Sequence, residues 1–330
     1  MGRLSLFLSL AVACGGSSKP VQLAPLPDDL AAAPPSEAAP APQAAPQPAP
    51  PAPAAPPPAP ARQEPAVERK VAALTTTVTL VSGGTGMKAP LRYFARPGAR
   101  QALELALDFS GEQDANRQIL PTLVLLADAV TRSVDKDGTA AYTITVTGTD
   151  ARAVNGSPIP LDEFKAVVSR LAGLSISGTR SATGVSSDVT LRVEHLEDKA
   201  AKALELIRLT LPTLPRLPKE NLGVGAKWKA TTAAKLAEKL DITQVTDYEV
   251  VSHIGATWTI KGTTQISGRD QQLEGNKISG IGGTGSSELI IVDGGAYPTY
   301  KATLETQFQA SGPNVSTGFV LKIGAAVTPR

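Results

Sequence analysis

Apolar and polar residues alternate along most of the chain beyond Arg69. Leu74 to Val81 and Gln101 to Phe109 place apolar or β-branched residues at every second position, which predicts strands with one buried face. Similar runs occur at 120–134, 140–148, 174–180, 185–193, 241–251, 256–266, 287–292, 300–308 and 318–323. The pattern therefore predicts about a dozen strands.

Two segments have helical periodicity instead. Apolar residues recur three and four positions apart from Leu161 to Leu171, with acidic residues in the first turn. A second run of this kind extends from Leu196 to Leu211 and stops at Pro212. Neither helix has a strongly cationic polar face, so each apolar stripe is expected to pack on the sheet rather than on a membrane.

Strands on both sides of two helices indicate an α+β fold that is mainly β. We expect a strongly curled antiparallel sheet, similar to a half-open barrel, with about two helices. Asp137-Gly138 between two strand patterns predicts a hairpin, because glycine accepts the positive φ of such a turn. A calcium site at Asp135 and Asp137 is the alternative, although the loop lacks the further ligands and terminal glutamate of an EF-hand.

The N-terminus has the order of an export signal. Arg3 precedes an apolar run from Leu4 to Leu10, and small or β-branched residues lead to Cys14, the single cysteine of the chain. At about ten residues the run is too short to span a bilayer as a helix. An ordinary signal cleaved after Ala13, leaving Cys14 as a free thiol, is the alternative interpretation.

Residues Leu10 to Gly15 resemble the lipobox of a bacterial lipoprotein signal peptide. The resemblance implies that residues 1–13 are removed and that Cys14 is lipidated and becomes the mature N-terminus. The protein would then be anchored to the membrane through N-terminal acyl chains such as palmitate. Gly15 stands where such proteins can have aspartate, which implies the outer membrane of a Gram-negative cell envelope.

A proline-rich segment separates Cys14 from the alternating region. Of the 28 prolines, 17 lie between Pro20 and Pro65, and residues 31–61 are almost only alanine and proline. Proline prevents helix propagation, so we expect residues 14–66 to form a disordered, polyproline-like tether, and residues 67–330 to form the β-rich globular domain. A PxxP ligand at Pro57 to Pro60 is the alternative to a simple tether.

Composition narrows the possible partners. With 32 basic and 30 acidic residues the formal net charge is +2, which gives no electrostatic case for nucleic acid or an anionic membrane surface. Aromatic residues make up 4% of the chain, which argues against sugar platforms and base-stacking surfaces.

Catalytic motifs are missing from the sequence. His195 and His253 are the only histidines and the domain has no cysteine, so no metal and no cofactor is predicted. The segment 184–188 lacks the second glycine of a GxSxG elbow, and Trp228 stands where GxGxxG would need its last glycine. We therefore expect a protein that is not an enzyme. Two carboxylates brought together in a cleft would instead support a hydrolase.

Two looser resemblances concern the domain. Residues Pro218 to Trp228 resemble a motif of uncharacterised bacterial lipoproteins of β-rich build. The order of predicted elements is similar to that of half-open-barrel lipoprotein carriers and related lipid-binding lipoproteins. These resemblances imply a fold but no known activity.

The resulting hypothesis is a membrane-anchored, non-enzymatic envelope lipoprotein that binds an apolar ligand or lipid. The side chains predicted to line the site are those of Val124, Leu126, Ile260, Ile290 and Leu304. Ordinary core packing is the alternative for each of them. A structural or interaction module that binds another envelope protein is the rival function, and an envelope hydrolase is the third.

Overall fold

The computed structural model describes residues 66–330, except residues 72, 94–95, 115, 195–197, 211–213, 237–238 and 313–315. The predicted signal peptide, Cys14, the tether up to residue 65 and His195 lie outside the described residues. The first strand begins at Val67, and all elements discussed below belong to one compact unit.

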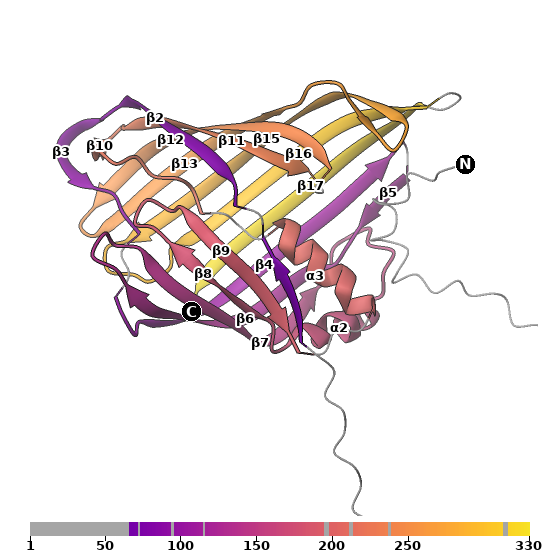
Figure 1. Cartoon of the computed structure of the whole chain (residues 1–330), viewed down its shortest axis with the longest axis horizontal. Helices are drawn as coiled ribbons and strands as arrows, with labels where there is room; N and C mark the ends of the chain where they lie inside the picture. The colour runs from indigo at the N-terminus through magenta and orange to yellow at the C-terminus, as the bar shows by residue number, and fades with distance from the viewer. Residues whose placement is uncertain are drawn as a thin grey trace, which may run out of the picture. The chain divides into compact units, whose positions relative to one another are not determined.

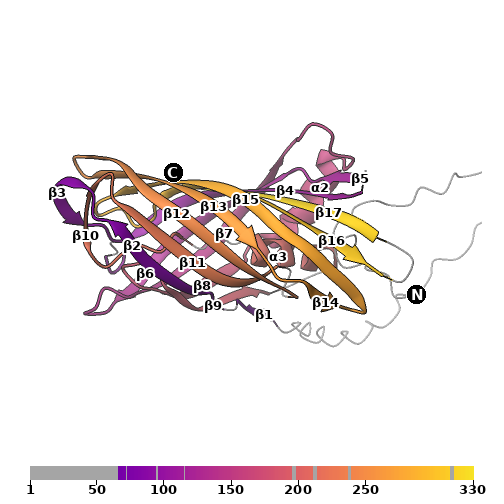
Figure 2. The same cartoon turned by 90° about the horizontal axis from the view of Figure 1, so that it is seen from above.

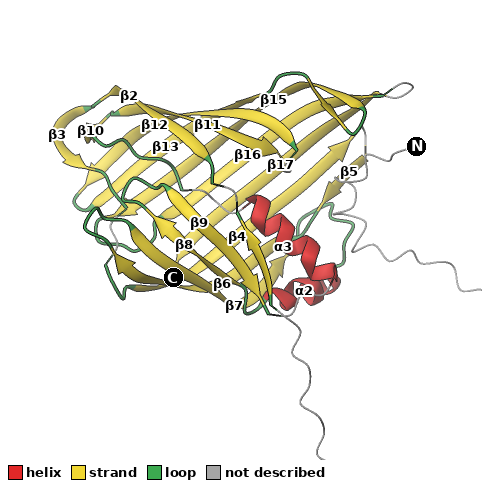
Figure 3. Ribbon diagram, viewed as in Figure 1, coloured by secondary structure: helices red, strands yellow, loops and turns green. Residues whose placement is uncertain are grey.

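Strands make up most of the described chain (Figures 1 and 3). The strands are β1 (Val67–Lys70), β2 (Thr75–Ser82), β3 (Thr85–Pro90), β4 (Arg100–Gln113), β5 (Asn116–Ile119), β6 (Thr122–Val134), β7 (Ala140–Arg152), β8 (Ser175–Arg180), β9 (Ser186–Val193), β10 (Asn221–Val224), β11 (Lys227–Leu236), β12 (Leu240–Ile254), β13 (Thr257–Ser267), β14 (Gln271–Leu273), β15 (Asn276–Val292), β16 (Thr299–Ser311) and β17 (Ser316–Pro329). The helices are α2 (Leu161–Val168), continued by a short 3-10 turn η1 (Ser169–Leu171), and α3 (Asp198–Thr210).

A single antiparallel sheet of 15 strands organises the domain. Its main path runs β1-β9-β8-β7-β6-β4-β17-β16-β15-β13-β12-β11-β2, while β14 pairs with β15, β5 pairs with β4, and β3 and β10 form a separate pair. The two edge strands, β1 and β2, are consecutive in the chain and are joined only by residues 71–74. The chain crosses from one edge to the other a second time through α3.

Alternation of side chains decides which face of the sheet is buried. Along β13, buried Trp258, Ile260 and Ile266 alternate with exposed Lys261 and Gln265. The side chains of successive strand residues point to opposite faces, so one face carries the core and the other carries charged residues.

Both predicted helices are present. In the first, Phe164, Val168 and Leu171 are buried, and in the second Leu204 and Ile207 are buried, as the spacing of their apolar residues predicts. The hairpin predicted at Asp-Gly also forms, because the turn 135–138 joins β6 and β7.

The apolar side chains of the core-side face form two clusters. The larger core contains both helices, the first strands of the domain and both tryptophans. The smaller core contains Leu240, Ile242, Ile266, Ile278, Ile281, Phe308, Ala310 and Phe319, from the opposite ends of β12 to β17. Ile260 of the larger core and Ile266 of the smaller core lie on the same face of β13, with Gly262 and Thr264 between them.

The expected fold class is confirmed in its coarse form: the domain is mainly β, with a large antiparallel sheet and two α-helices among the described residues. The expectation of a strongly curled, barrel-like sheet is not supported, because the strand ladder is open and β1 does not pair with β2. The alternating pattern determines which face of a strand is buried, but curvature depends on register and bulges, which the pattern does not specify.

Candidate functional site

A half-buried strip crosses the core-side face of the sheet between the two cores. We call it the amphipathic band and define it by Phe109, Ala302, Leu304, Ile323 and Ala325 as its apolar part and Thr76, Thr232, Gln244 and Ser287 as its polar part. All of these side chains alternate with residues of the opposite face and share the face of the cores. Unlike the core residues, all nine are partly accessible to solvent.

The apolar part of the band is built on three neighbouring strands. Phe109 of β4 lies opposite Ile323 of β17, which in turn lies opposite Leu304 of β16. Ala302 and Ala325 form the next pair along β16 and β17, towards the larger core. Directly opposed residues on one face of an antiparallel pair are close neighbours, so these side chains form one continuous apolar surface.

The polar part of the band lies on β15, β12, β11 and β2. The hydroxyl groups of Thr76 and Thr232 are 2.9 Å apart and form a hydrogen bond. Next to them, Thr246 and Thr264 are buried and bond through their hydroxyl oxygens at 2.9 Å. The band thus offers apolar carbon on one side and hydroxyl and amide groups on the other, which suits an amphiphilic molecule better than a purely polar one.

Tyrosine side chains border the band on the side of the larger core. Gly262 makes room for Tyr248, because a Cβ at this glycine would lie 2.7 Å from the Tyr248 Cε1 atom. Burial raises the pKa of Tyr248 to about 12, although hydrogen bonds with Thr246 and Ser287 oppose that rise. Burial also raises the pKa of Tyr300, which precedes Ala302 on the same face of β16. Both phenols are therefore neutral at physiological pH and act as hydrogen-bonding groups.

A buried arginine packs against two other tyrosines, Tyr93 and Tyr297. Arg180 of β8 is 5% exposed, and its guanidinium lies 4.8 Å from the ring centre of Tyr297 and 5.4 Å from that of Tyr93. It donates a hydrogen bond to the Ala296 carbonyl oxygen at 3.1 Å, and no carboxylate of the described residues forms an ion pair with it. Aromatic faces and a carbonyl oxygen therefore stabilise this charge in place of an acid.

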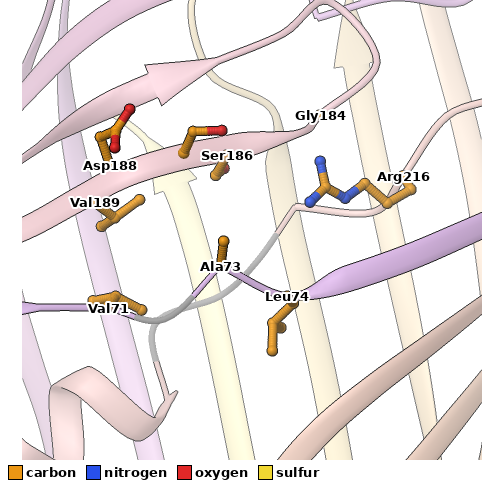
Figure 4. Close-up of a pocket in the computed structure, with 9 residues that line it drawn as sticks. Val71, Ala73, Leu74, Gly184, Ser186, Asp188, Val189 and Arg216 are labelled. Carbon is orange, nitrogen blue, oxygen red and sulfur yellow. The ribbon is translucent and has the colours of Figure 1, made fainter.

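A small pocket lies where the linker between β1 and β2 meets the start of β9 (Figure 4). Its volume is about 40 Å³, and its lining includes Leu74, Ser186, Asp188 and Arg216. The Arg216 guanidinium points into it, and its Nη1 atom is buried without a hydrogen-bond partner among the described residues. Burial lowers the pKa of Arg216. The pocket has room for water but not for a lipid chain.

The turn beside this pocket requires glycine. Gly184 has a φ of +89°, and a Cβ there would lie 2.8 Å from the Tyr93 ring and 2.9 Å from the Pro215 carbonyl oxygen. Tyr93 in turn donates a hydrogen bond to that same oxygen at 2.8 Å. The segment that fails to match a GxSxG elbow therefore forms a structural turn between β8 and β9.

The five predicted ligand-lining residues do not come together. Ile260 is buried in the larger core, and Leu304 lies in the amphipathic band. Val124 and Ile290 alternate with core residues and so lie on the opposite face, and half-buried Leu126 contacts neither core cluster. Whether any of the five contacts a ligand stays a prediction. Phe109 and Ile323 were not predicted, although both fall within predicted strands.

The remaining chemical candidates have local partners. His253 stacks on Trp258 with ring centres 3.6 Å apart. The Asp137 carboxylate accepts hydrogen bonds from the Thr139 amide at 3.0 Å and the Thr139 hydroxyl at 3.1 Å. Within the described part of the chain, no three histidine, cysteine or acidic side chains gather as metal ligands, and no helix is long and apolar enough to span a membrane.

Comparison with known proteins adds no relative. No protein-family model matches the sequence, and no curated protein matches it either.

Proposed function

We propose that this protein is a lipid-anchored, non-enzymatic component of a bacterial cell envelope that binds the apolar part of an amphiphilic ligand on its amphipathic band.

 The observation that carries the proposal is the position of Phe109, Leu304 and Ile323, which lie on the core-side face but remain partly accessible to solvent. Soluble domains bury such a face unless it is used, because exposed apolar surface costs about 25 cal/mol for each Å² left in water.

The proposed attachment rests on the sequence. Cys14 is the only cysteine, and it follows an apolar run in a segment that resembles a lipobox. Acyl chains on this residue would hold the domain at a membrane, where apolar ligands are concentrated. Envelope localisation and ligand binding are thus two parts of one proposal, and each has its own test.

We also propose that the core-side face is concave, in the manner of a half-open barrel. Adjacent strands lie about 4.8 Å apart, so a flat ladder along the main path of 13 strands would be roughly 58 Å wide. The two edge strands are nevertheless joined by residues 71–74 alone, and the step from Lys70 to Thr75 can span at most about 18 Å. This short connection supports a bend that brings the two edges towards each other.

Retained lipid provides the first test. The full chain, purified from its membrane in mild detergent, is examined by native mass spectrometry for a copurifying amphiphile. Ile323→Ser is expected to reduce the bound fraction severalfold. Full burial of an isoleucine side chain contributes about 1.5–3 kcal/mol, and about half of that remains to be gained when a ligand covers half-buried Ile323. The matched control is Val245→Ser, which removes a half-buried aliphatic side chain from the opposite face of the sheet and should leave binding unchanged.

The alternative, an interaction module without a ligand, makes the opposite forecast. In that case neither the unaltered chain nor the two variants would retain an amphiphile, and the band would be covered by a protein instead. Membrane attachment is tested separately: Cys14→Ser should release the domain from membranes, and mass spectrometry of the mature chain should find diacylglycerol on Cys14. An unmodified N-terminus at another residue would disprove the anchor.

A further inference from the structure

Exposed aliphatic side chains gather at one end of the sheet. Seven large apolar residues of the described chain are exposed, and six of them lie where β2, β3, β10, β12 and β15 begin or end. We call these six the apolar rim: Val81, Met87, Val224, Val251, Ile254 and Val292. Met87 is 88% exposed and Ile254 is 77% exposed, which is far from the usual state of such side chains.

Backbone hydrogen bonds show that the segments of the apolar rim are neighbours. The Gly223 amide donates to the Gly83 carbonyl at 2.9 Å, and the Gly225 amide donates to the Val250 carbonyl at 2.9 Å. The Asp293 amide completes the row by donating to the Ala256 carbonyl at 2.8 Å. Figure 2 shows β3 and β10 at this end of the sheet and β14 at the other.

Charge is distributed unevenly between the two ends. At the apolar rim, segments 81–87, 223–226 and 251–257 contain no acidic residue, lysine or arginine, and segment 292–296 contains Asp293 as its single charged residue. At the opposite end, segments 235–241 and 267–277 hold eight charged residues. Water solvates the charged turns well. The exposed aliphatic side chains of the apolar rim have an unfavourable hydration free energy, which contact with another apolar surface would relieve.

Two cations flank the apolar rim. Lys88 directly follows Met87, and the Arg96 guanidinium lies beside Gly294, 3.7 Å from the position that a Cβ would occupy. Neither forms an ion pair with another residue in the described part of the chain. Both side chains are therefore available to an anionic group that approaches from outside.

We propose that the apolar rim is a membrane-contact surface that inserts shallowly into the lipid headgroup region. Met87 and Ile254 would enter the acyl boundary, and Lys88 and Arg96 would meet lipid phosphates. A lipid surface fits better than a protein partner, because the rim presents separate aliphatic side chains on glycine-containing turns and lacks the exposed tryptophan or tyrosine that anchors most protein interfaces. This contact relies on the side chains of the apolar rim and the two cations beside it, so the small net charge of the whole chain does not argue against it.

A single-cysteine label tests this contact in the full chain. In the Cys14→Ser background, which removes the predicted acyl anchor, Met87→Cys is labelled with an environment-sensitive fluorophore and mixed with phosphatidylethanolamine/phosphatidylglycerol vesicles. The emission should shift to the blue, whereas a label at Gln272→Cys, exposed in β14 at the opposite end, should not respond. Equal responses at both positions, or none at either, would overturn the proposal.

Vesicle cosedimentation supplies the second readout in the same background. Met87→Ser combined with Ile254→Ser should weaken vesicle binding by about tenfold or more, because two exposed apolar side chains no longer enter the bilayer. Val185→Ser is the matched control, since Val185 is exposed but lies outside the apolar rim. A label shift that appears without vesicles and grows with protein concentration would instead identify a second copy of the chain as the partner and refute the lipid contact.

The membrane contact can fail while the proposed function stands. Amphiphile retention on the amphipathic band is measured without vesicles, and Ile323→Ser does not alter the apolar rim. Conversely, loss of retained amphiphile with intact vesicle binding would remove the ligand proposal only.

Discussion

The two ends of the sheet use different chemistry to meet the same requirement for stability. Behind the apolar rim, the larger core contains or contacts all five tyrosines and both tryptophans of the chain. At the opposite end the smaller core is aliphatic apart from Phe308 and Phe319, whose rings stack 5.0 Å apart. Exposed ion pairs lie around it, such as Lys235–Asp241 at 2.6 Å and Lys277–Asp270 at 2.9 Å.

The two ends differ in whether their polar groups are buried, and removing a polar group from water costs free energy. The larger core includes residues of both helices, and phenol groups and a guanidinium are buried in it or beside it. The smaller core has no helix in it, and its surrounding charges stay hydrated. We therefore expect stability to respond strongly to changes behind the apolar rim and weakly to changes at the charged end.

Alkaline pH should give the largest effect. Burial raises the pKa of Tyr248 and of Tyr297 to about 12, so the folded state favours their neutral forms. The stability from these groups is complete below the unfolded pKa near 10 and is lost as the pH rises through the folded values. Two shifts of about two units correspond to a loss on the order of 5 kcal/mol between roughly pH 10 and 12. Unfolding in urea, followed with phenolate absorbance, checks this expectation.

A matched variant sharpens the pH test. The Tyr297 hydroxyl is buried without a hydrogen-bond partner among the described residues, so Tyr297→Phe should keep or increase stability at neutral pH. It should also remove about 2–3 kcal/mol of the alkaline loss, the share of one phenol, while the buried phenols of Tyr93, Tyr248 and Tyr300 still oppose ionisation in the folded state. If the variant has the same alkaline midpoint as the unaltered chain, Tyr297 is not part of the titration.

Core deletion should give the next largest effect. Trp228 is fully buried, stacks on Tyr248 at 5.2 Å and donates to the Arg216 carbonyl oxygen at 2.9 Å. Trp228→Ala should therefore lower the free energy of unfolding by about 3–5 kcal/mol. Ile278→Ala in the smaller core should lower it by about 2–3 kcal/mol, the lower part of the range for such changes. Equal losses in chemical denaturation would remove the energetic distinction between the two cores.

The strands and helices of this domain were largely predictable from alternation and helical spacing. The strands around Leu105 and Ile260 and the helices around Phe164 and Leu204 all follow the period expected for one buried face. The first half of β15 was missed because its Gly-rich sequence, from Asn276 to Ser286, has few apolar residues to reveal the period.

The candidate sites were less predictable, because they depend on register. Val124 and Ile260 look alike in sequence, but the pairing of strands places them on opposite faces. The apolar rim depends on which turns meet at one end of the sheet, and Met87 and Ile254 are more than 160 residues apart in sequence. Local patterns carry no information about such distant neighbours.

Removal of the buried guanidinium should have a moderate effect. Arg180→Ala should lower the free energy of unfolding by about 2 kcal/mol, because it leaves space beside Tyr93 and Tyr297 and removes two cation–π contacts. Arg180→Met restores much of the volume without the buried charge, and its stability should lie within about 1 kcal/mol of the unaltered chain. Thermal and urea unfolding of both variants would separate packing from charge. A methionine variant as unstable as the alanine variant would show that the charge itself is required.

The smallest effect is expected at the charged end. Lys235 and Asp241 lie opposite each other on β11 and β12, and their side chains are 59% and 74% exposed. Exposed pairs contribute little, because water screens the attraction and both flexible side chains lose rotamer freedom. Lys235→Ala should therefore change the free energy of unfolding by less than about 0.5 kcal/mol, and the difference should vanish in 1 M salt. A loss above about 2 kcal/mol that survives high salt would mean that this end is stabilised by more than hydrated ion pairs, and the contrast between the two ends would no longer hold.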